Sequence, residues 1–414
     1  MKFLHLRLIL PFLLLLAFGW VLLNLTGAGF KIDKFFRENF LSKNNEEILL
    51  ASFQFPGSEG FYANGLIADG VVWSVDGATG KILSSFDLAT QQEKKITLSH
   101  GPAIICATSR EFLIVTSMNS SMARQIYLLD SKDGAIKWQI EDKDFNCSGA
   151  IISDNEVLSI NSSSLSSTIY SILERIDLRD GSVKKIDLGN NRVPILRGGL
   201  GSVSNVVSVN GNKYFMVENW EVKERSQKYI EQSVIGLDPS GKVILDRPGA
   251  YSSQIVAKDN VIYYNEQFGE QHEEEYLIAF DVQSNKELWR QKSNGRTRFL
   301  AIQGNYIIQG DNRISSRSLT NGTVSWSRSI INIINNPFIT NAIVVGDKIG
   351  IVYTVVEVPG MYPKMSYNFE LMNDQGKTLY TLVGFAKDPE PNILLTSEKN
   401  NLYLAGKGNK VYKF

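Results

Sequence analysis

The chain has 414 residues, and its 43 basic and 43 acidic side chains leave no formal net charge at pH 7. This balance provides no basic surface of the kind that binds nucleic acid, so we expect no nucleic-acid partner. Hydrophobic residues form 43% of the chain, which is enough for one large core, and we expect no second globular domain.

Residues 1–28 have the pattern of a signal anchor or a signal peptide. Basic residues precede an uncharged run of 18 residues, Leu8 to Leu25, which is the lower limit for a segment that crosses a bilayer. The small residues of Thr26–Ala28 suit cleavage by a signal peptidase. We favour an uncleaved transmembrane helix, with a secreted chain as the alternative if cleavage follows Ala28. In both cases the rest of the chain is predicted to be extracytoplasmic, that is, periplasmic or extracellular.

Residues 29–47 follow as a juxtamembrane linker or helix. Apolar residues at positions 32, 35, 36 and 40 have helical spacing and would form one apolar face, lying on lipid or on the folded domain. The alternative is a plain linker between membrane and domain. Ile48–Phe55 is then a strand-like run, the first segment of a folded domain predicted to span residues 48–414.

Between Val71 and Tyr380 the sequence repeats one unit seven times: a β-run, an Asp-like residue, a glycine turn and a second β-run. In the three clearest copies a tryptophan follows the Asp-like position by eight residues, and Gly or Asn occupies the fourth step. These copies are Asp130, Gly134 and Trp138; Asp281, Asn285 and Trp289; and Ser318, Gly322 and Trp326. An Asp at the end of a strand accepts hydrogen bonds from the turn backbone, and Gly or Asn supplies a positive φ angle. The tryptophan offers a large flat face and one N–H donor, suited to wedging between neighbouring sheets.

Four looser copies carry the same turn with other residues at the tryptophan position. They are Asp76–Gly80 with Ser84, Asp177–Gly181 with Lys185, Asp238–Gly241 with Leu245, and Asn373–Gly376 with Tyr380. Successive turn markers lie 37 to 60 residues apart, an interval that suits a four-stranded sheet per repeat. Short runs rich in β-branched and aromatic residues, without helical periodicity, predict an all-β fold.

The two ends of the repeat region indicate how the sheets close into a ring. Residues 392–414 form a partial unit that lacks its outermost strand, whereas Ile48–Phe55 belongs to no repeat. If the early run completes the last sheet, the ring has no open edge. We therefore predict an eight-bladed β-propeller, with seven blades as the fallback.

The repeat resembles the PQQ-like propeller repeat of the quinoprotein-like superfamily, whose blades carry the signature Asp-x-x-(Asp/Thr)-Gly-x-x-x-Trp. Asp130, Asp133, Gly134 and Trp138 match every position of that signature. The resemblance covers about residues 48–414, and it is nearest to the non-enzymatic branch that includes the outer-membrane assembly-factor propeller. It implies the fold but leaves the function open, because the family contains enzymes, scaffolds and assembly factors.

An enzyme remains the alternative: a quinoprotein dehydrogenase-like protein or a hydrolase with an unrecognised axial site. The resemblance implies that such a dehydrogenase needs adjacent cysteines, a calcium site and a catalytic Asp, and this chain has no Cys-Cys pair. The three histidines are scattered and the sequence contains no Gly-x-Ser-x-Gly elbow. We therefore name no catalytic, cofactor-binding or metal-binding residue and expect no cofactor.

The two cysteines, Cys106 and Cys147, lie in neighbouring repeats. One disulfide is an option in an oxidising compartment. The apolar run Ala103–Ala107 around Cys106 favours a buried free thiol instead. Glycosylation sequons matter only if the source modifies exported proteins; they occur at Asn119, Asn146, Asn161 and Asn321.

Three long segments are predicted to be loops between the second and third strands of their repeats, hence on one rim. They are a charged loop over 219–229 with Trp220, an acidic loop over 265–275, and an apolar loop over 356–363 with Met361 and Tyr362. Trp220, Met361 and Tyr362 are candidate interaction residues, because aromatic residues and Met are enriched at interface centres. The sequence thus predicts a membrane-anchored, extracytoplasmic, non-catalytic platform for the interaction or assembly of envelope proteins.

Overall fold

A computed structural model describes most of the chain from residue 51 onward. The described residues are 51–54, 66–68, 70–75, 80–87, 90, 92–109, 111–118, 124–165, 168–198, 203–223, 226–250, 254–268, 274–293, 297, 299–310, 313–330, 338–358, 364–387, 394–398, 401–406 and 410–414. The predicted anchor over 1–28 and the predicted linker or helix over 29–47 lie outside these residues. Within the described part of the chain, no helix has the length and apolarity needed to cross a bilayer.

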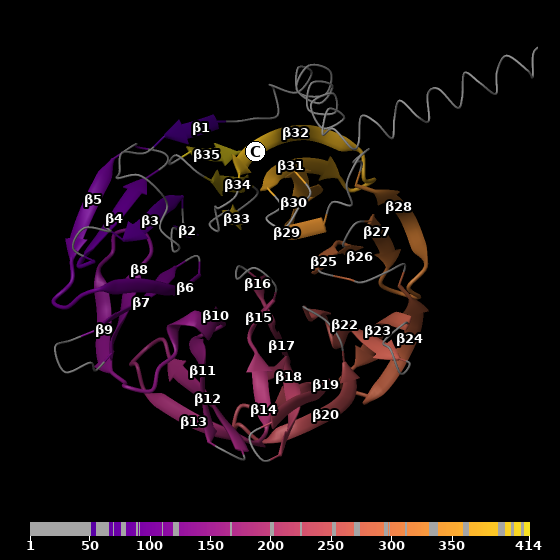
Figure 1. Cartoon of the computed structure of the whole chain (residues 1–414), viewed down its shortest axis with the longest axis horizontal. Coiled ribbons are helices and arrows are strands. Elements are labelled where there is room, and N and C mark those ends of the chain that lie inside the picture. The colour runs from indigo at the N-terminus through magenta and orange to yellow at the C-terminus, as the bar shows by residue number, and fades with distance from the viewer. Residues whose placement is uncertain are drawn as a thin grey trace, which may run out of the picture.

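The described strands form eight four-stranded antiparallel blades set around a common axis (Figure 1); six blades are separate sheets, and blades 4 and 5 belong to one nine-stranded sheet. Blades 1 and 2 comprise β2 (Leu66–Ala68), β3 (Val71–Val75), β4 (Ile82–Asp87) and β5 (Glu93–Thr97), then β6 (Ala103–Thr108), β7 (Phe112–Met118), β8 (Arg124–Asp130) and β9 (Ile136–Glu141). Blades 3 and 4 comprise β10 (Ile151–Ser153), β11 (Glu156–Leu165), β12 (Thr168–Asp177) and β13 (Val183–Asn190), then β17 (Val206–Val209), β18 (Asn212–Lys223), β19 (Ser226–Leu237) and β20 (Val243–Ala250).

The second half of the ring repeats this plan. Blades 5 and 6 comprise β21 (Val256–Lys258), β22 (Val261–Phe268), β23 (Glu274–Asp281) and β24 (Lys286–Lys292), then β25 (Phe299–Gln303), β26 (Tyr306–Gly310), β27 (Arg313–Ser318) and β28 (Val324–Ser329). Blades 7 and 8 comprise β29 (Phe338–Val345), β30 (Lys348–Val358), β31 (Lys364–Asn373) and β32 (Thr378–Lys387), then β33 (Leu394–Glu398), β34 (Asn401–Gly406), β35 (Lys410–Lys413) and β1 (Ala51–Gln54).

Blade 8 closes the ring with strands from both ends of the repeat region. β1 pairs antiparallel with β35, from Ala51 opposite Lys413 to Gln54 opposite Lys410, and the two lie side by side in Figure 1. The closure and the count of eight blades agree with the sequence prediction, and the fallback of seven does not hold. In a closed ring every blade packs against a neighbouring blade on both of its faces.

Blades 3, 4 and 5 have additional links. β14 (Arg192–Ile195) leaves blade 3 and pairs with β18 of blade 4, while β20 of blade 4 meets β22 of blade 5 through Ala250 and Glu266. The short β15 (Arg197–Gly198) and β16 (Val203–Ser204) pair with each other near the centre of the ring in Figure 1. A short 3₁₀ turn, η2 (Cys147–Gly149), connects blades 2 and 3.

The core lies between adjacent blades. Successive side chains of a strand point to opposite faces, so an inner strand buried on both sides is apolar along its length. β7 shows this: Leu113 and Val115 pack toward blade 1 with Trp73, whereas Ile114 packs toward blade 3 with Val157. Each sheet is thereby fixed to both of its neighbours.

The antiparallel order also determines the two faces of the ring. Hairpins between second and third strands emerge on one face, and turns between third and fourth strands emerge on the other. We call these the hairpin rim and the turn rim.

Candidate functional site

The repeated turns sit on the turn rim and share one hydrogen-bond pattern. In blade 2, Asp130 Oδ1 accepts the N–H of Lys132 at 2.9 Å, and the Gly134 N–H donates to the Asp130 carbonyl at 2.9 Å. Gly134 has a φ of 70° and Asn285, the corresponding residue of blade 5, a φ of 54°. Asp281 Oδ1 likewise accepts the N–H of Gln283 at 2.8 Å. These contacts show how the Asp-like and Gly-like positions form the turn.

The repeat tryptophans connect each blade to the turn of the next. Nε1 of Trp138 donates to the carbonyl of Leu178 at 2.8 Å, a residue that directly follows the Asp-like position of blade 3. Trp289 donates to the equivalent carbonyl of Leu319 at 2.8 Å, and Trp326 to that of Asp374 at 2.7 Å. The tryptophan is therefore both a wedge and a donor to a fixed carbonyl across the seam.

The turn glycine lies directly against the tryptophan of the preceding blade. A Cβ atom on Gly322, whose φ is 71°, would lie 2.8 Å from the Trp289 ring, and one on Gly376 would lie 2.8 Å from the Trp326 ring. Separations below about 3 Å are not tolerated between carbon atoms without movement. The glycine is thus required by its backbone conformation and by the packing of the indole.

Trp73 performs this function between blades 1 and 2, although it lies outside the repeat position. It is fully buried on β3, and its Nε1 donates to the carbonyl of Ser131 at 2.8 Å. Sequence reasoning did not identify Trp73, because it sits within the apolar run Val71–Val75, where the spacing to a turn gives no signal.

The seam between blades 3 and 4 has no tryptophan, and basic side chains take its place. Ile186 lies beneath Gly241, 2.7 Å from where a Cβ would be. Nη1 of Arg175 donates to the carbonyl of Pro239 at 3.1 Å, and Nζ of Lys184 donates to that of Ser240 at 2.5 Å. The Arg175 guanidinium therefore reaches the same carbonyl position that an indole reaches at the other seams.

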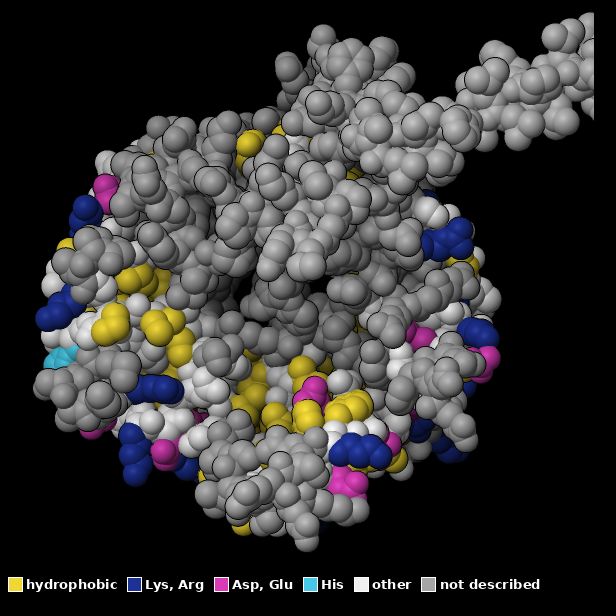
Figure 2. Space-filling view, viewed as in Figure 1, with side chains coloured by type: hydrophobic (Ala, Val, Ile, Leu, Met, Phe, Trp, Pro, Cys, Tyr) yellow, Lys and Arg dark blue, Asp and Glu magenta, His cyan; other side chains and the backbone are white. Residues whose placement is uncertain are grey.

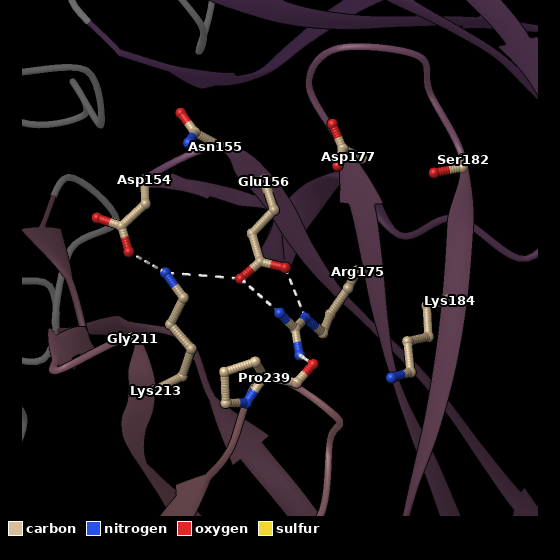
Figure 3. Close-up of a pocket in the computed structure, with 10 residues that line it drawn as sticks. All are labelled: Asp154, Asn155, Glu156, Arg175, Asp177, Ser182, Lys184, Gly211, Lys213 and Pro239. Atoms are coloured by element: carbon tan, nitrogen blue, oxygen red, sulfur yellow. Dashed lines mark hydrogen bonds and ion pairs between the residues drawn. The ribbon is translucent and has the colours of Figure 1, made fainter.

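A polar pocket of about 340 Å³ opens at this seam on the turn rim (Figure 3). Its described lining residues are Asp154, Asn155, Glu156, Arg175, Asp177, Ser182, Lys184, Gly211, Lys213 and Pro239. Glu156 binds Arg175 through both carboxylate oxygens, at 2.5 and 3.1 Å, and its Oε1 lies 3.5 Å from Nζ of Lys213. Burial acts to raise the pKa of Asp154, but hydrogen bonds from Lys213 and Ser208 outweigh it and lower that pKa. Asp154, Glu156, Arg175 and Lys213 pair with one another, whereas Asp177 pairs with Arg179 and Lys184 donates to the Ser240 carbonyl, both outside the lining.

The segment predicted as an acidic loop over 265–275 is largely strand, and part of it is buried. Asn265 is fully buried and Glu275 is 7% exposed; the Asn265 amide donates to Glu275 Oε1 at 2.6 Å. Glu275 also accepts the N–H of Thr297 at 2.9 Å. Residues 265–268 belong to β22 and residues 274–275 to β23, so this part of the predicted loop is strand, and Glu266 and Glu275 are buried.

Glu266 of the same segment belongs to an ion-pair network between blades 4 and 5. Its two oxygens bind Arg247 of β20 at 3.0 Å and Arg290 of β24 at 2.9 Å, and both arginines also contact Glu287 at 2.8 Å. Burial, with Glu266 beside it, raises the pKa of Tyr264, which donates to Glu266 at 3.0 Å. This seam also lacks a tryptophan, so charged groups replace it here as well.

Among the candidate interaction residues, Trp220 lies on the β18–β19 hairpin of the hairpin rim. Its indole is half-buried and packs edge-on against Tyr229, with ring centroids 5.8 Å apart. A register shift at Asn219 and Trp220 leaves Ile230 without a cross-strand partner, and Ile230 is 51% exposed. The segments 219–229, 265–275 and 356–363 lie around hairpins between second and third strands, as predicted. The prediction of a loop over 219–229 was wrong, however, because 219–223 belong to β18 and 226–229 to β19. Met361 and Tyr362 themselves lie outside the described residues.

The charges on the face seen in Figure 2 are distributed around the rim. Described Lys and Arg side chains alternate there with Asp and Glu, while hydrophobic side chains lie nearer the axis.

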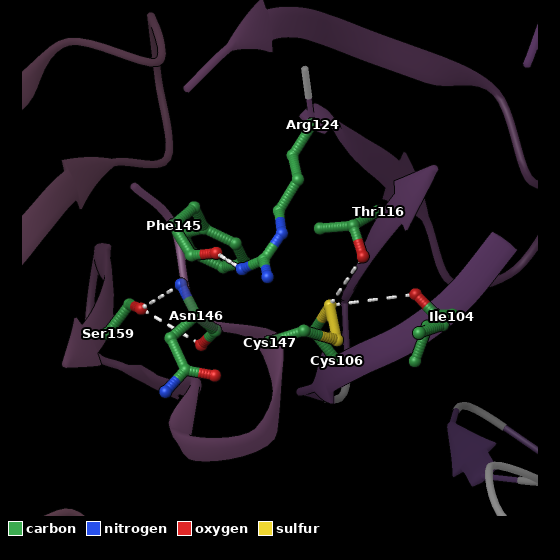
Figure 4. The surroundings of a disulfide bond; sticks show 8 residues. All are labelled: Ile104, Cys106, Thr116, Arg124, Phe145, Asn146, Cys147 and Ser159. Atoms are coloured by element: carbon green, nitrogen blue, oxygen red, sulfur yellow. Dashed lines mark hydrogen bonds between the residues drawn. A yellow bond between two sulfur atoms is a disulfide. The ribbon is translucent and has the colours of Figure 1, made fainter. Parts of the chain in front are cut away.

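Cys106 and Cys147 form a disulfide, with sulfur atoms 2.08 Å apart (Figure 4). The favoured prediction of a buried free thiol was wrong. Cys106 is 2% exposed, as expected from its apolar run, but the connection after β9 returns Cys147 of η2 to the same place. Free and disulfide-bonded cysteines are both commonly buried, so the apolar residues around Cys106 do not show whether it forms a disulfide.

A cluster of carboxylates lies between blades 2 and 3. Asp142 and Asp144 of the connection after β9 and Glu174 of β12 have carboxylate oxygens within 4.8 Å of one another. Nζ of Lys185 lies 3.0 Å from Asp144, 3.1 Å from Glu174 and 3.9 Å from Asp142. Burial raises the pKa of Glu174, and Lys185 only partly opposes this effect. This cluster could not be predicted from the sequence, because Glu174 lies on a strand far along the chain from Asp142 and Asp144 and no recognisable spacing links them.

The fold and its seams define a PQQ-like β-propeller in which, among the described residues, four seams between blades, 1–2, 2–3, 5–6 and 6–7, carry a tryptophan–turn hydrogen bond. The chain belongs to the family described as outer membrane protein assembly factor BamB, whose model matches residues 68–328. A comparison with the curated proteins gives no match.

Solved structures resemble the chain along most of its length. BamB from Moraxella catarrhalis is 14% identical, with 88% of this chain and 98% of that chain covered and a TM-score of 0.48. Sqt1 from Saccharomyces cerevisiae is 10% identical, with 90% and 99% covered and a TM-score of 0.51. The computationally designed Ika8 protein is 12% identical, with 87% and 98% covered and a TM-score of 0.47. At these identities the likeness concerns the fold alone.

Proposed function

We propose that this protein is a non-catalytic scaffold of the cell envelope, held at the membrane by residues 1–28, which binds and helps to assemble other envelope proteins. The family description as an outer membrane protein assembly factor supports this role. The disulfide between Cys106 and Cys147 supports an extracytoplasmic location, because disulfides persist in oxidising compartments.

The β18–β19 hairpin is the observation that carries the proposal. Within the described strands, β19 pairs with β20 only from Gln232 onward, and β18 pairs with β14 only up to Asn219. The hairpin therefore continues beyond its sheet on the hairpin rim. An extended hairpin with an exposed aliphatic side chain is suited to adding a strand of a partner protein.

Ile230 and Trp220 provide the apolar contact next to this extended backbone. Ile230 is 51% exposed, and Trp220 stacks edge-on with Tyr229 behind it. Large apolar side chains at the centre of a patch commonly supply most of the binding energy of an interface. We infer that this hairpin contacts the partner and that the closed ring holds it rigidly.

The test is affinity purification of the full chain from solubilised membranes, comparing Ile230→Asp with Ile136→Asp. Ile136 is a matched control because it is 48% exposed but lies on β9 at the turn rim. We expect the wild type and Ile136→Asp to recover one stoichiometric envelope protein, and Ile230→Asp to lose it. Equal recovery by the two variants would contradict the assignment of the hairpin, and recovery of no envelope protein by any form would contradict the scaffold. N-terminal sequencing of the same material distinguishes the anchored from the cleaved chain.

A further inference from the structure

The carboxylate cluster between blades 2 and 3 has more negative charge than its single lysine neutralises. Asp142, Asp144 and Glu174 carry three negative charges when ionised, and Lys185 supplies one positive charge at 3.0 to 3.9 Å. Two like charges at such distances repel strongly where protein replaces water. A divalent cation in place of the lysine would reduce the net negative charge of the cluster from two units to one.

The carboxylate of Glu174 gives a second observation that points to a cation at this cluster. Its side chain has no exposed surface, and neither carboxylate oxygen accepts a hydrogen bond of good geometry. Burying a carboxylate without hydrogen bonds is costly, and buried carboxylates in proteins are paired or coordinate metals. The Lys185 ammonium approaches Oε1 only as an ion pair, so Glu174 has coordination capacity left over.

The connection that carries Asp142 and Asp144 is fixed in position by contacts with blade 2. The Asp144 N–H donates to Asp142 Oδ1 at 2.8 Å, which sets the two carboxylates side by side. Further along the connection, the Arg124 guanidinium donates to the Phe145 carbonyl, and Cys147 is tied to β6 by the disulfide (Figure 4). Such a connection holds its ligands in place before any ion arrives.

We propose that Asp142, Asp144 and Glu174 form a calcium-binding site that joins blades 2 and 3, and that Lys185 occupies it when calcium is absent. All three ligands offer oxygen, the donor that calcium prefers, and their oxygens all lie within 4.8 Å of one another, close enough for one ion to contact all three. Magnesium demands a near-ideal octahedron and loses its waters reluctantly, so a site made of three carboxylates from two blades suits calcium better.

Lys185 is able to leave because of where it stands. It belongs to β13, the outermost strand of blade 3, and its side chain is 42% exposed, so its ammonium can move to solvent. Displacement of this built-in cation weakens binding, and we expect an affinity in the range of extracellular calcium modules, with a Kd of about 0.1–1 mM.

The direct test is calorimetric titration of calcium into the full-length chain, purified in detergent and freed of metal with EDTA. We expect one bound calcium per chain, weaker binding of magnesium, and a rise of the melting temperature with calcium. Asp144→Asn should weaken binding on the order of tenfold, because affinity follows the charge of the ligands. Asp180→Asn is the control, since Asp180 is an exposed carboxylate of a neighbouring turn and should leave binding unchanged.

Lys185→Met distinguishes two interpretations of the cluster: a calcium site, and a set of carboxylates neutralised by the lysine alone. Without calcium this variant should melt below the wild type, because three carboxylates then face one another; with calcium it should regain stability and bind more tightly than the wild type. Absence of calcium binding in both the wild type and Lys185→Met, with no rescue of the variant, would overturn the proposal. Equal binding of magnesium and calcium would contradict the assignment to calcium.

Discussion

Substitution of Gly322 by alanine tests the way the blades are joined. Gly322 has a φ of 71°, and a Cβ there would lie 2.8 Å from the Trp289 ring and still closer to Cγ of Gln291. The left-handed backbone costs an alanine about 1–2 kcal/mol. Forcing a methyl group into a packed site adds typically 1–3 kcal/mol. The sum predicts a loss of roughly 2–5 kcal/mol in the free energy of unfolding.

Gly304→Ala is the matched control for this substitution. Gly304 also has a left-handed backbone, with a φ of 56°, but a Cβ there meets no atom within 4 Å. It should therefore cost only the backbone share of about 1–2 kcal/mol. The two variants share the backbone cost and differ in the contacts of the added methyl group with Trp289 and Gln291.

Urea unfolding followed by tryptophan fluorescence and circular dichroism measures both losses. In a Trp289→Val background, Gly322→Ala should cost less than it does in the wild type, because the ring that meets the methyl group is gone and only the contact with Cγ of Gln291 remains. Equal losses for Gly322→Ala and Gly304→Ala in the wild-type background would refute the reasoning, since the indole would then not be packed against the turn.

Three further outcomes follow from other contacts. Replacing Cys106 and Cys147 together by alanine opens a loop with a sequence separation of 41, which the loop-entropy relation values at about 4 kcal/mol, measurable as a fall in the urea midpoint. Arg175→Met removes the donor to Pro239 and the bidentate partner of Glu156, so we expect a loss of about 2 kcal/mol, whereas Arg192→Met, at a more exposed pair with Asp246, should cost less than about 1 kcal/mol. Burial acts to raise the pKa of Asp130, but hydrogen bonds from the Lys132 N–H and the Lys137 ammonium outweigh it and lower that pKa. The ionised Asp130 carboxylate therefore stabilises the fold above its unfolded pKa near 3.9, and this contribution is lost as the pH falls toward the folded pKa. Asp130→Asn should flatten this acid dependence when unfolding is compared at pH 7 and pH 3, and an unchanged dependence would contradict the assignment.

The features predicted from sequence are those that recur at a fixed local spacing. Asp130, Gly134 and Trp138 lie within nine residues, so one strand, one turn and the next strand are enough to reveal the motif. Closure of the ring by Ile48–Phe55 could also be predicted from the sequence, because residues 392–414 lack one strand of a four-stranded unit and Ile48–Phe55 is a strand that belongs to no repeat.

The features that were missed depend on residues brought together by the ring. Arg175 replaces a tryptophan only because Glu156, from the neighbouring strand, aims its guanidinium at the Pro239 carbonyl. The cluster around Glu174 joins two blades, and Lys185 was noted only as a departure from the tryptophan position. No local period marks such contacts, so they become visible when distances are known.

Site-specific photocrosslinking in living cells tests the scaffold role most directly. A photoreactive amino acid is placed at position 230 on the hairpin rim and, for comparison, at position 136 on the turn rim, where the exposures of the natural residues are 51% and 48%. The scaffold model predicts that position 230 captures one envelope protein and position 136 captures none. Capture of that protein at position 136 alone, or capture at neither position, would contradict the role we assign to the β18–β19 hairpin.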